Sequence, residues 1–263
     1  MRALFLRELR RFLTGRLLFL ALVCVLFSLS ERKHSLMSYD NFVLHMISEH
    51  YYLTFFMVPM VFYLLYHHLE EDLEAVLIRA GSYPRYFAVK AAALAANMSM
   101  VVLLQFAVIM LAGLGLPAGA DFPLSDKDDP MLTKLLVFSE TFQYPWQATL
   151  VSVLYMMFGL GMLAIVFLTL HHFLEKRKVA ILTITLYFLM VYGMKSKIPE
   201  LTRIPFIFIN NYIIFIYNLT YPYALQVSLI SLAMVAAAIC WLIGKHWSKG
   251  RQWQWYRPGK RAR

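Results

Sequence analysis

The sequence predicts an all-α, polytopic membrane protein whose six transmembrane helices form a single domain over residues 1–263, and two observations support this. First, 60% of the residues are hydrophobic and only 15% are charged, whereas a soluble domain is about 45–50% apolar and about 25% charged. Second, the apolar residues are gathered in long blocks between short charged segments, and the mean hydropathy is +0.61. A soluble fold of this size could not bury so many apolar side chains. We therefore interpret the blocks as helices that span a bilayer.

Each block is compared with the hydrocarbon layer of about 30 Å that about 20 helical residues cross. The predicted spans cover residues 17–30, 51–69, 91–116, 148–170, 179–194 and 224–244. The shorter blocks can cross with help from flanking residues. Pro59 is expected to kink the second span, because proline cannot donate the helical hydrogen bond. No span is expected to carry a buried Asp, Glu, Lys or Arg, and this disfavours an ion-coupled carrier.

The distribution of Lys and Arg orients the spans, because cytoplasmic loops carry an excess of these residues. Of the 25 Lys and Arg, 18 lie in segments on the side of the N-terminus and 7 lie on the opposite side. We therefore expect both termini in the cytoplasm, with residues 245–263 as a basic cytoplasmic tail. The cytoplasmic segments account for the net charge of +10, so nucleic acid is not expected as a partner.

Residues 1–16 are expected to form a helix with an apolar side and a basic side, lying along the inner leaflet. The apolar side would consist of Leu4, Phe5, Leu9, Phe12 and Leu13. The alternative is an ordinary basic flank that only sets the topology.

Residues 198–221 separate the fifth and sixth spans and are not expected to cross the bilayer. Their prolines and asparagines would break a continuous helix and leave backbone groups that lipid cannot satisfy. An extra span would also place the basic tail on the outside, against the charge distribution. We expect one or two short re-entrant or outer-leaflet helices here.

The segment 70–87, between the second and third spans, opens with acidic residues and closes with basic ones. This order suits the dipole of a short helix. The acidic part comprises Glu70, Glu71, Asp72 and Glu74. A cytoplasmic helix of this kind would offer a contact surface to a soluble partner. The alternative is a solvated loop whose charges only mark the topology.

This order of segments resembles the permease subunits of ABC transporters of the ABC-2 type. Such permeases have a basic amphipathic elbow helix, six spans, a coupling helix after the second span, and short outer helices before the sixth. The corresponding segments here are 1–16, 70–87 and 198–221. The local resemblance is carried by Glu71, Glu74, Val76, Leu77, Arg85, Tyr86, Phe87 and Lys90. The chain departs from the family pattern in three ways. It lacks a Gly-Thr pair, it has Ala80 and Gly81 where a proline is expected, and its Arg85 comes about two residues later than the arginine of the family pattern.

The resemblance implies an exporter subunit of the bacterial plasma membrane that is not itself an enzyme. A separate ABC ATPase subunit would dock on Glu70, Glu71, Asp72, Glu74, Leu77, Arg79, Gly81, Pro84 and Arg85. The chain would pair with a second copy or a sister permease within the lipid bilayer. It contains no Gly-rich loop ending in Gly-Lys-Ser or Gly-Lys-Thr, so the partner subunit would bind ATP. No cofactor is expected on this chain.

Polar residues and glycines within the spans allow more than one interpretation. Asn97 and Gln105 share one face of the third span, where they could line a pathway or form interhelical hydrogen bonds. The second role is the more common one for such residues. Gly159 and Gly161 indicate a close contact of the fourth span with a neighbouring helix.

Metal binding and disulfide bonding are not expected. The pairs His67–His68 and His171–His172 each lie near an acidic residue at the inner end of a span. Adjacent residues, however, point about 100° apart on a helix, so we expect no metal ion. Cys24 and Cys240 lie inside apolar blocks, which excludes a disulfide framework.

Two further function classes remain open. The chain could be a membrane scaffold or assembly protein that recruits a soluble cytoplasmic partner without transport. An intramembrane enzyme is the least favoured class, because the spans contain no Ser/His, paired-Asp or His-Glu-x-x-His arrangement.

Overall fold

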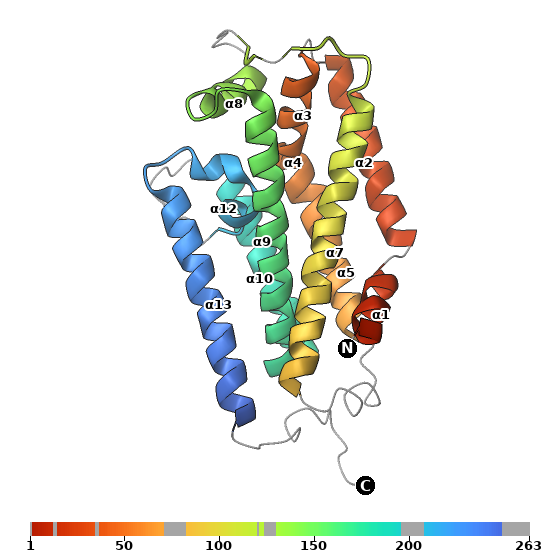
Figure 1. Cartoon of the computed structure of the whole chain (residues 1–263), viewed down its shortest axis with the longest axis vertical. Helices are drawn as coiled ribbons and strands as arrows, with labels where there is room; N and C mark the ends of the chain where they lie inside the picture. The colour runs from red at the N-terminus through yellow and green to blue at the C-terminus, as the bar shows by residue number, and fades with distance from the viewer. Residues whose placement is uncertain are drawn as a thin grey trace.

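The computed structural model describes residues 2–12, 15–34, 37–70, 83–119, 121–123, 130–195 and 208–248, and these residues form helices and no strand. The all-α prediction is therefore confirmed for the described part of the chain. Figure 1 shows the long helices side by side, with α1 near the end of the bundle where α5 ends and α7 begins. In chain order the helices are α1 (Arg2–Phe12), α2 (Gly15–His34), α3 (Tyr39–Ile47), α4 (His50–Tyr52), the π-helical turn Leu53–Met57, α5 (Val58–Glu70), α7 (Tyr83–Ala112), α8 (Pro130–Ser139), α9 (Pro145–Phe173), α10 (Lys176–Lys195), α12 (Asn210–Ile213), the 3-10 helix η2 (Phe215–Asn218) and α13 (Ala224–Ser248).

Among the described residues, three helices are long and apolar enough to cross a bilayer, namely Pro84–Ala112, Pro145–Phe173 and Ala224–Lys245. A fourth crossing results if Ala3–Arg10 and Gly15–Lys33, which are bent by 51°, are taken as one span. Large apolar side chains lie exposed on the outer faces of the long helices, as on a surface in contact with lipid. They include Leu22, Leu103, Phe158, Phe188 and Met234. The chain has the helices of a membrane protein, and the number six and the elbow role of α1 stay predictions.

The second predicted span, 51–69, is part of a longer, interrupted helix. α3, α4, the π-helical turn and α5 follow one another from Tyr39 to Glu70, and Figure 1 shows them one below another. The interruption comes at Ser48, whose hydroxyl donates back to the carbonyl oxygen of Leu44 at 2.7 Å. The π-helical turn ends at Met57, two residues before Pro59, which cannot donate a helical hydrogen bond. The change in helix type therefore lies next to the proline that was expected to kink the span, and the kink itself stays a prediction.

The third span differs from its predicted limits, 91–116. α7 already begins at Tyr83, and Pro84 in its first turn is favourable there because the missing N–H has no helical partner to lose. Residues 113–115 form a turn, in which Gly115 has a φ of +88°. A glycine in this left-handed region commonly ends a helix. The helix α8 in the following loop was not predicted.

The centre of the bundle is formed by α7 and α9, which pack along each other (Figure 1). Gly161 of α9 faces Ala95 of α7, and a Cβ added at Gly161 would lie 3.5 Å from the Ala95 Cβ. The close helix contact predicted from the two glycines is therefore present at Gly161. Gly159 lies against a different neighbour, the backbone of Tyr212 in α12.

The described part of the predicted outer segment, 208–221, packs into the bundle against α9. The hydroxyl of Tyr155 on α9 donates to the carbonyl oxygen of Asn211 at 2.5 Å. Asn218 Nδ2 donates to the same oxygen at 2.8 Å, and the Ser228 hydroxyl of α13 donates to Asn218 Oδ1 at 2.7 Å. Short helices therefore do lie between α10 and α13, and two buried side-chain donors satisfy the backbone carbonyl oxygen of Asn211.

Candidate functional site

At the end of the bundle where α5 ends, a buried ion pair joins α1 to α5. Nε2 of His68 lies 2.9 Å from Oε2 of Glu8, and the two side chains are only 3% and 2% exposed. The contact between these two atoms is an ion pair rather than a hydrogen bond, and it forms when His68 is protonated. The ion pair fixes α1 to the last turns of α5, just before the predicted coupling segment.

Two further contacts hold α1 in the same place. Asn97 of α7 donates from Nδ2 to the carbonyl oxygen of Glu8 at 3.4 Å. The ring of Phe12 packs edge-on against the His68 imidazole, with 5.8 Å between the ring centres. We call Glu8, Phe12, His68 and Asn97 the α1 anchor. It connects the N-terminal helix to both helices that flank residues 71–82.

Lys90, in the second turn of α7, is fully buried. Its ammonium donates to the hydroxyl of Tyr86 at 3.3 Å and lies 5.7 Å from the centre of the same ring. Glu8 and Glu49 are also buried, at 1% and 5% exposure. The expectation of spans without buried charges is therefore wrong, because Lys90 lies within the apolar helix Pro84–Ala112. A charged side chain in an apolar helix is tolerated only when other polar groups surround it.

Sequence reasoning missed the α1 anchor, although one signal was present. Glu8 is the only acidic residue among the first 30. In a helix it falls on the apolar side, four residues after Leu4 and four before Phe12. An acidic side chain on an apolar face is costly to bury without a partner, so its position predicts a buried cationic partner.

Most of the residues predicted to contact a partner ATPase lie outside the described residues. These are Glu71, Asp72, Glu74, Leu77, Arg79 and Gly81. Glu70 is the last residue of α5, and Pro84 and Arg85 lie exposed in the first turn of α7. The predicted segment 70–87 therefore includes the start of α7.

The two polar residues singled out in the third span are both buried between helices. Asn97 is fully buried in the α1 anchor. Gln105 is 2% exposed, and its backbone carbonyl oxygen lies 4.0 Å from Sγ of Cys24 on α2. Both positions are on the side of α7 that faces α1 and α2.

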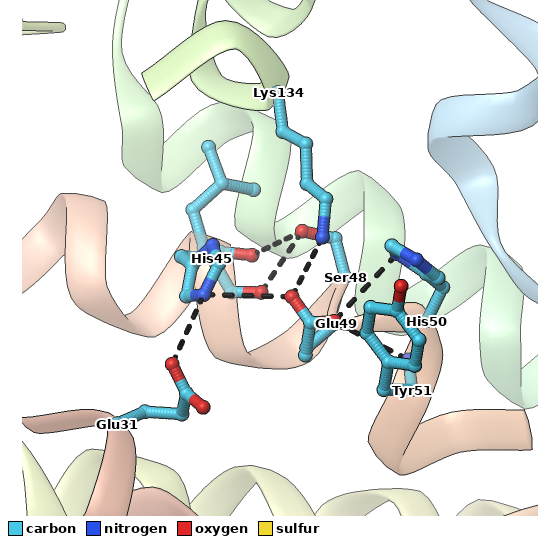
Figure 2. A network of polar contacts seen from close by, with 8 residues as sticks. Glu31, His45, Ser48, Glu49, His50, Tyr51 and Lys134 are labelled. Atoms are coloured by element: carbon cyan, nitrogen blue, oxygen red, sulfur yellow. Dashed lines mark hydrogen bonds and ion pairs between the residues drawn. The ribbon is translucent and has the colours of Figure 1, made fainter. Parts of the chain in front are cut away.

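A second polar cluster lies at the interruption between α3 and α4, toward the opposite end of the bundle. Figure 2 shows Glu49 at its centre, with Lys134 of α8 reaching down to one carboxylate oxygen at 2.7 Å. His45 Nε2 lies 3.5 Å from the same oxygen and 4.0 Å from Oε2 of Glu31. Nδ1 of His50 lies 3.6 Å from the other Glu49 oxygen. We call these residues the Glu49 cluster.

Glu49 also has a local role, because its carboxylate accepts a hydrogen bond from the backbone N–H of Tyr51 at 3.3 Å. It thereby caps the N-terminus of the helix that restarts after the interruption. The residue belongs to none of the helices able to cross a membrane. Burial alone would raise the pKa of its carboxyl, but Lys134 and the two imidazoles outweigh this and lower the pKa below its usual value. Glu49 is therefore the ionised centre that ties α8 to the interrupted helix.

Among the described residues, no group of three or more His, Cys, Asp or Glu could hold a metal ion. His68 is engaged by Glu8. The ring of His172 packs edge-on against Phe173, with 4.9 Å between centres.

Comparison with known proteins yields no relative: no protein-family model, no curated protein and no solved structure matches this chain.

Proposed function

We propose that this chain is the membrane-spanning permease subunit of an ATP-driven exporter of the ABC-2 type in a bacterial plasma membrane. It would form the translocation pathway with a second copy or a sister permease. A separate ATPase subunit would bind to residues 70–87. The six spans would be α2, residues 51–69 of the interrupted helix, α7, α9, α10 and α13. The amphipathic helix α1 would serve as the elbow helix.

The observation that supports this proposal best is the α1 anchor. A segment that receives force from an ATPase must be attached to elements that transmit it. Residues 71–82 follow α5 and precede α7, and the Glu8–His68 ion pair and Asn97 join both of these helices to α1. A displacement of residues 71–82 would therefore move α1, α5 and α7 together.

In this mechanism ATP binding and hydrolysis change the distance between two ATPase subunits, and each one displaces the segment docked on it. The translocation pathway would open to one side of the membrane and then to the other. The energy for this change comes from the different affinity of the ATPase for the two conformations of the permease. The chain's own contribution is mechanical. Its buried ion pair and hydrogen bonds keep the moving helices from separating.

Replacing Glu71 and Glu74 by alanine is expected to lower the permease-dependent stimulation of the partner ATPase by at least about tenfold, within the range of typical coupling energies. The acidic side chains would be the docking contacts. The measurement is ATP hydrolysis by the ATPase after co-expression and co-purification with the full chain. The matched control is D126A/D128A, which removes two acids from the predicted outer loop and should leave stimulation unchanged.

A membrane scaffold is the alternative that this experiment separates. A scaffold would still bind its soluble partner through residues 70–87, but ATP turnover would not depend on the chain. If no ATPase co-purifies, or if both double variants stimulate hydrolysis equally, the exporter proposal is wrong.

A further inference from the structure

One stripe of α1 faces away from the bundle and combines cationic with apolar groups. Ala3, Leu6, Arg7 and Arg10 line a surface hollow of about 460 Å³. Their spacing of i, i+3, i+4 and i+7 places them on one face of the helix. Leu6 is 42% exposed and Arg10 is exposed. We call these four residues the α1 outer stripe.

The orientation of this stripe is set by the opposite face of the same helix. Phe12 and Glu8 are 2% and 1% exposed, and Glu8 lies against His68 on α5. The single carboxylate of α1 is therefore turned inward, away from the outer stripe. Arg7 and Arg10 carry two positive charges on a face where α1 itself supplies no counter-charge.

The surface next to the stripe continues the same combination of groups. Arg16, at the start of α2, places its guanidinium 5.0 Å from the ring centre of Tyr63. After the bend of 51° between α1 and α2, α2 presents Leu18 and Leu22, which are 74% and 55% exposed. Cations thus occupy the corner of the two helices, and apolar side chains follow along α2.

We propose that the α1 outer stripe is a binding site for an anionic phospholipid of the surrounding leaflet. The phosphate lies between Arg7 and Arg10, whose guanidinium groups match phosphate oxygens in geometry and charge. One acyl chain covers Leu6 and Ala3. A free phosphate ion would gain nothing from the apolar half of the hollow. The inference is independent of the exporter proposal, since it needs only the membrane and the fold of α1.

The test compares lipids with identical acyl chains and different headgroups. Native mass spectrometry of the full chain in a neutral detergent measures the apparent affinity for dioleoyl phosphatidylglycerol and for dioleoyl phosphatidylcholine. R7Q/R10Q is expected to bind phosphatidylglycerol about 25-fold more weakly than the unchanged chain, or about fivefold for each arginine. Its affinity for phosphatidylcholine should not change. The melting temperature in phosphatidylcholine should also be unchanged, because Glu8 and His68 remain in place.

The matched control is R177Q/K178Q, which removes two exposed cations from the start of α10 and should bind phosphatidylglycerol as the unchanged chain does. The proposal is overturned if R7Q/R10Q keeps its affinity for phosphatidylglycerol. It is also overturned if the control variant loses as much, because binding would then reflect total charge. Displacement of the lipid by millimolar inorganic phosphate would likewise contradict it, since the site would then bind a free anion.

Discussion

Replacing Lys134 with methionine is expected to destabilise the protein by about 2–4 kcal/mol, near the range for breaking a buried ion pair. The Lys134 ammonium lies 2.7 Å from Glu49, whose side chain is 6% exposed. Without this cation the carboxylate stays buried with only the weaker support of His45 and His50. The lysine itself is 24% exposed, so the expected value lies toward the lower part of the range. Thermal unfolding in detergent should show a lower apparent melting temperature by about 5–15 °C.

The double variant E49Q/K134M separates a charge effect from lost packing. It should recover most of the stability that K134M loses, since no uncompensated carboxylate remains. A double-mutant cycle of K134M, E49Q and the double variant then gives the coupling energy of the pair. K33M is the control: it removes an exposed cation near the C-terminal end of α2. It should change the free energy of unfolding by no more than about 0.5 kcal/mol. If K33M and K134M had equal effects, the Glu49 cluster would not hold α8.

The same pair predicts a dependence on pH. Because the pKa of Glu49 is lowered in the folded protein, its contribution is present above the ordinary glutamate pKa of about 4.3 and is lost as the pH falls through the lower, native pKa. The difference in folding stability between the unchanged chain and E49Q should therefore become smaller in acid.

Replacing Gly159 with alanine is expected to cost about 3–5 kcal/mol, because its Cβ would overlap the carbonyl oxygen of Tyr212. This contact is with backbone, so no side-chain rotation can relieve it. α12 would have to move away from α9 and would break the hydrogen bond between Tyr155 and Asn211. The buried polar groups left without partners would add to the loss. Thermal unfolding of the G159A protein in detergent measures the effect.

Gly161 provides the matched control on the same helix. A Cβ there would make an ordinary van der Waals contact with Ala95 at 3.5 Å, and alanine favours a helix over glycine by about 1 kcal/mol. G161A should therefore be as stable as the unchanged chain or slightly more so. Equal losses for G159A and G161A would show that α12 does not lie against Gly159.

The long apolar helices are the part of the fold that the sequence predicts best. An uninterrupted apolar run of membrane length has few alternatives to a helix, and α7, α9 and α13 confirm this. The first and last residues of these helices are less predictable, because charged residues were taken to mark loops. Lys90 was assigned to the loop after the second span, yet it is fully buried on α7.

The two polar clusters could not be located from the sequence alone. Each depends on side chains from helices far apart in the chain, as when Lys134 of α8 reaches Glu49 at the start of α4. The interruption at Ser48 and Glu49 was missed for a related reason. The polar residues there were assigned to a loop outside the second span, whereas tertiary packing continues the helix through α3, which is almost entirely buried.

The α1 anchor gives the proposed coupling segment a defined mechanical context. Its cation, its carboxylate and its amide come from α5, α1 and α7, so a partner acting on residues 71–82 would act on three helices at once. An ATPase can dock on those residues only if they face the cytoplasm, as the distribution of Lys and Arg predicts.

Cysteine labelling of sealed right-side-out vesicles tests that orientation most directly. The background protein carries Cys24→Ala and Cys240→Ala, and single cysteines are introduced in the variants E74C and D126C. We predict that a membrane-impermeant maleimide labels D126C in sealed vesicles and labels E74C only after the membrane is permeabilised. Labelling of E74C in sealed vesicles would contradict a cytoplasmic docking segment and, with it, the proposed coupling to an ATPase.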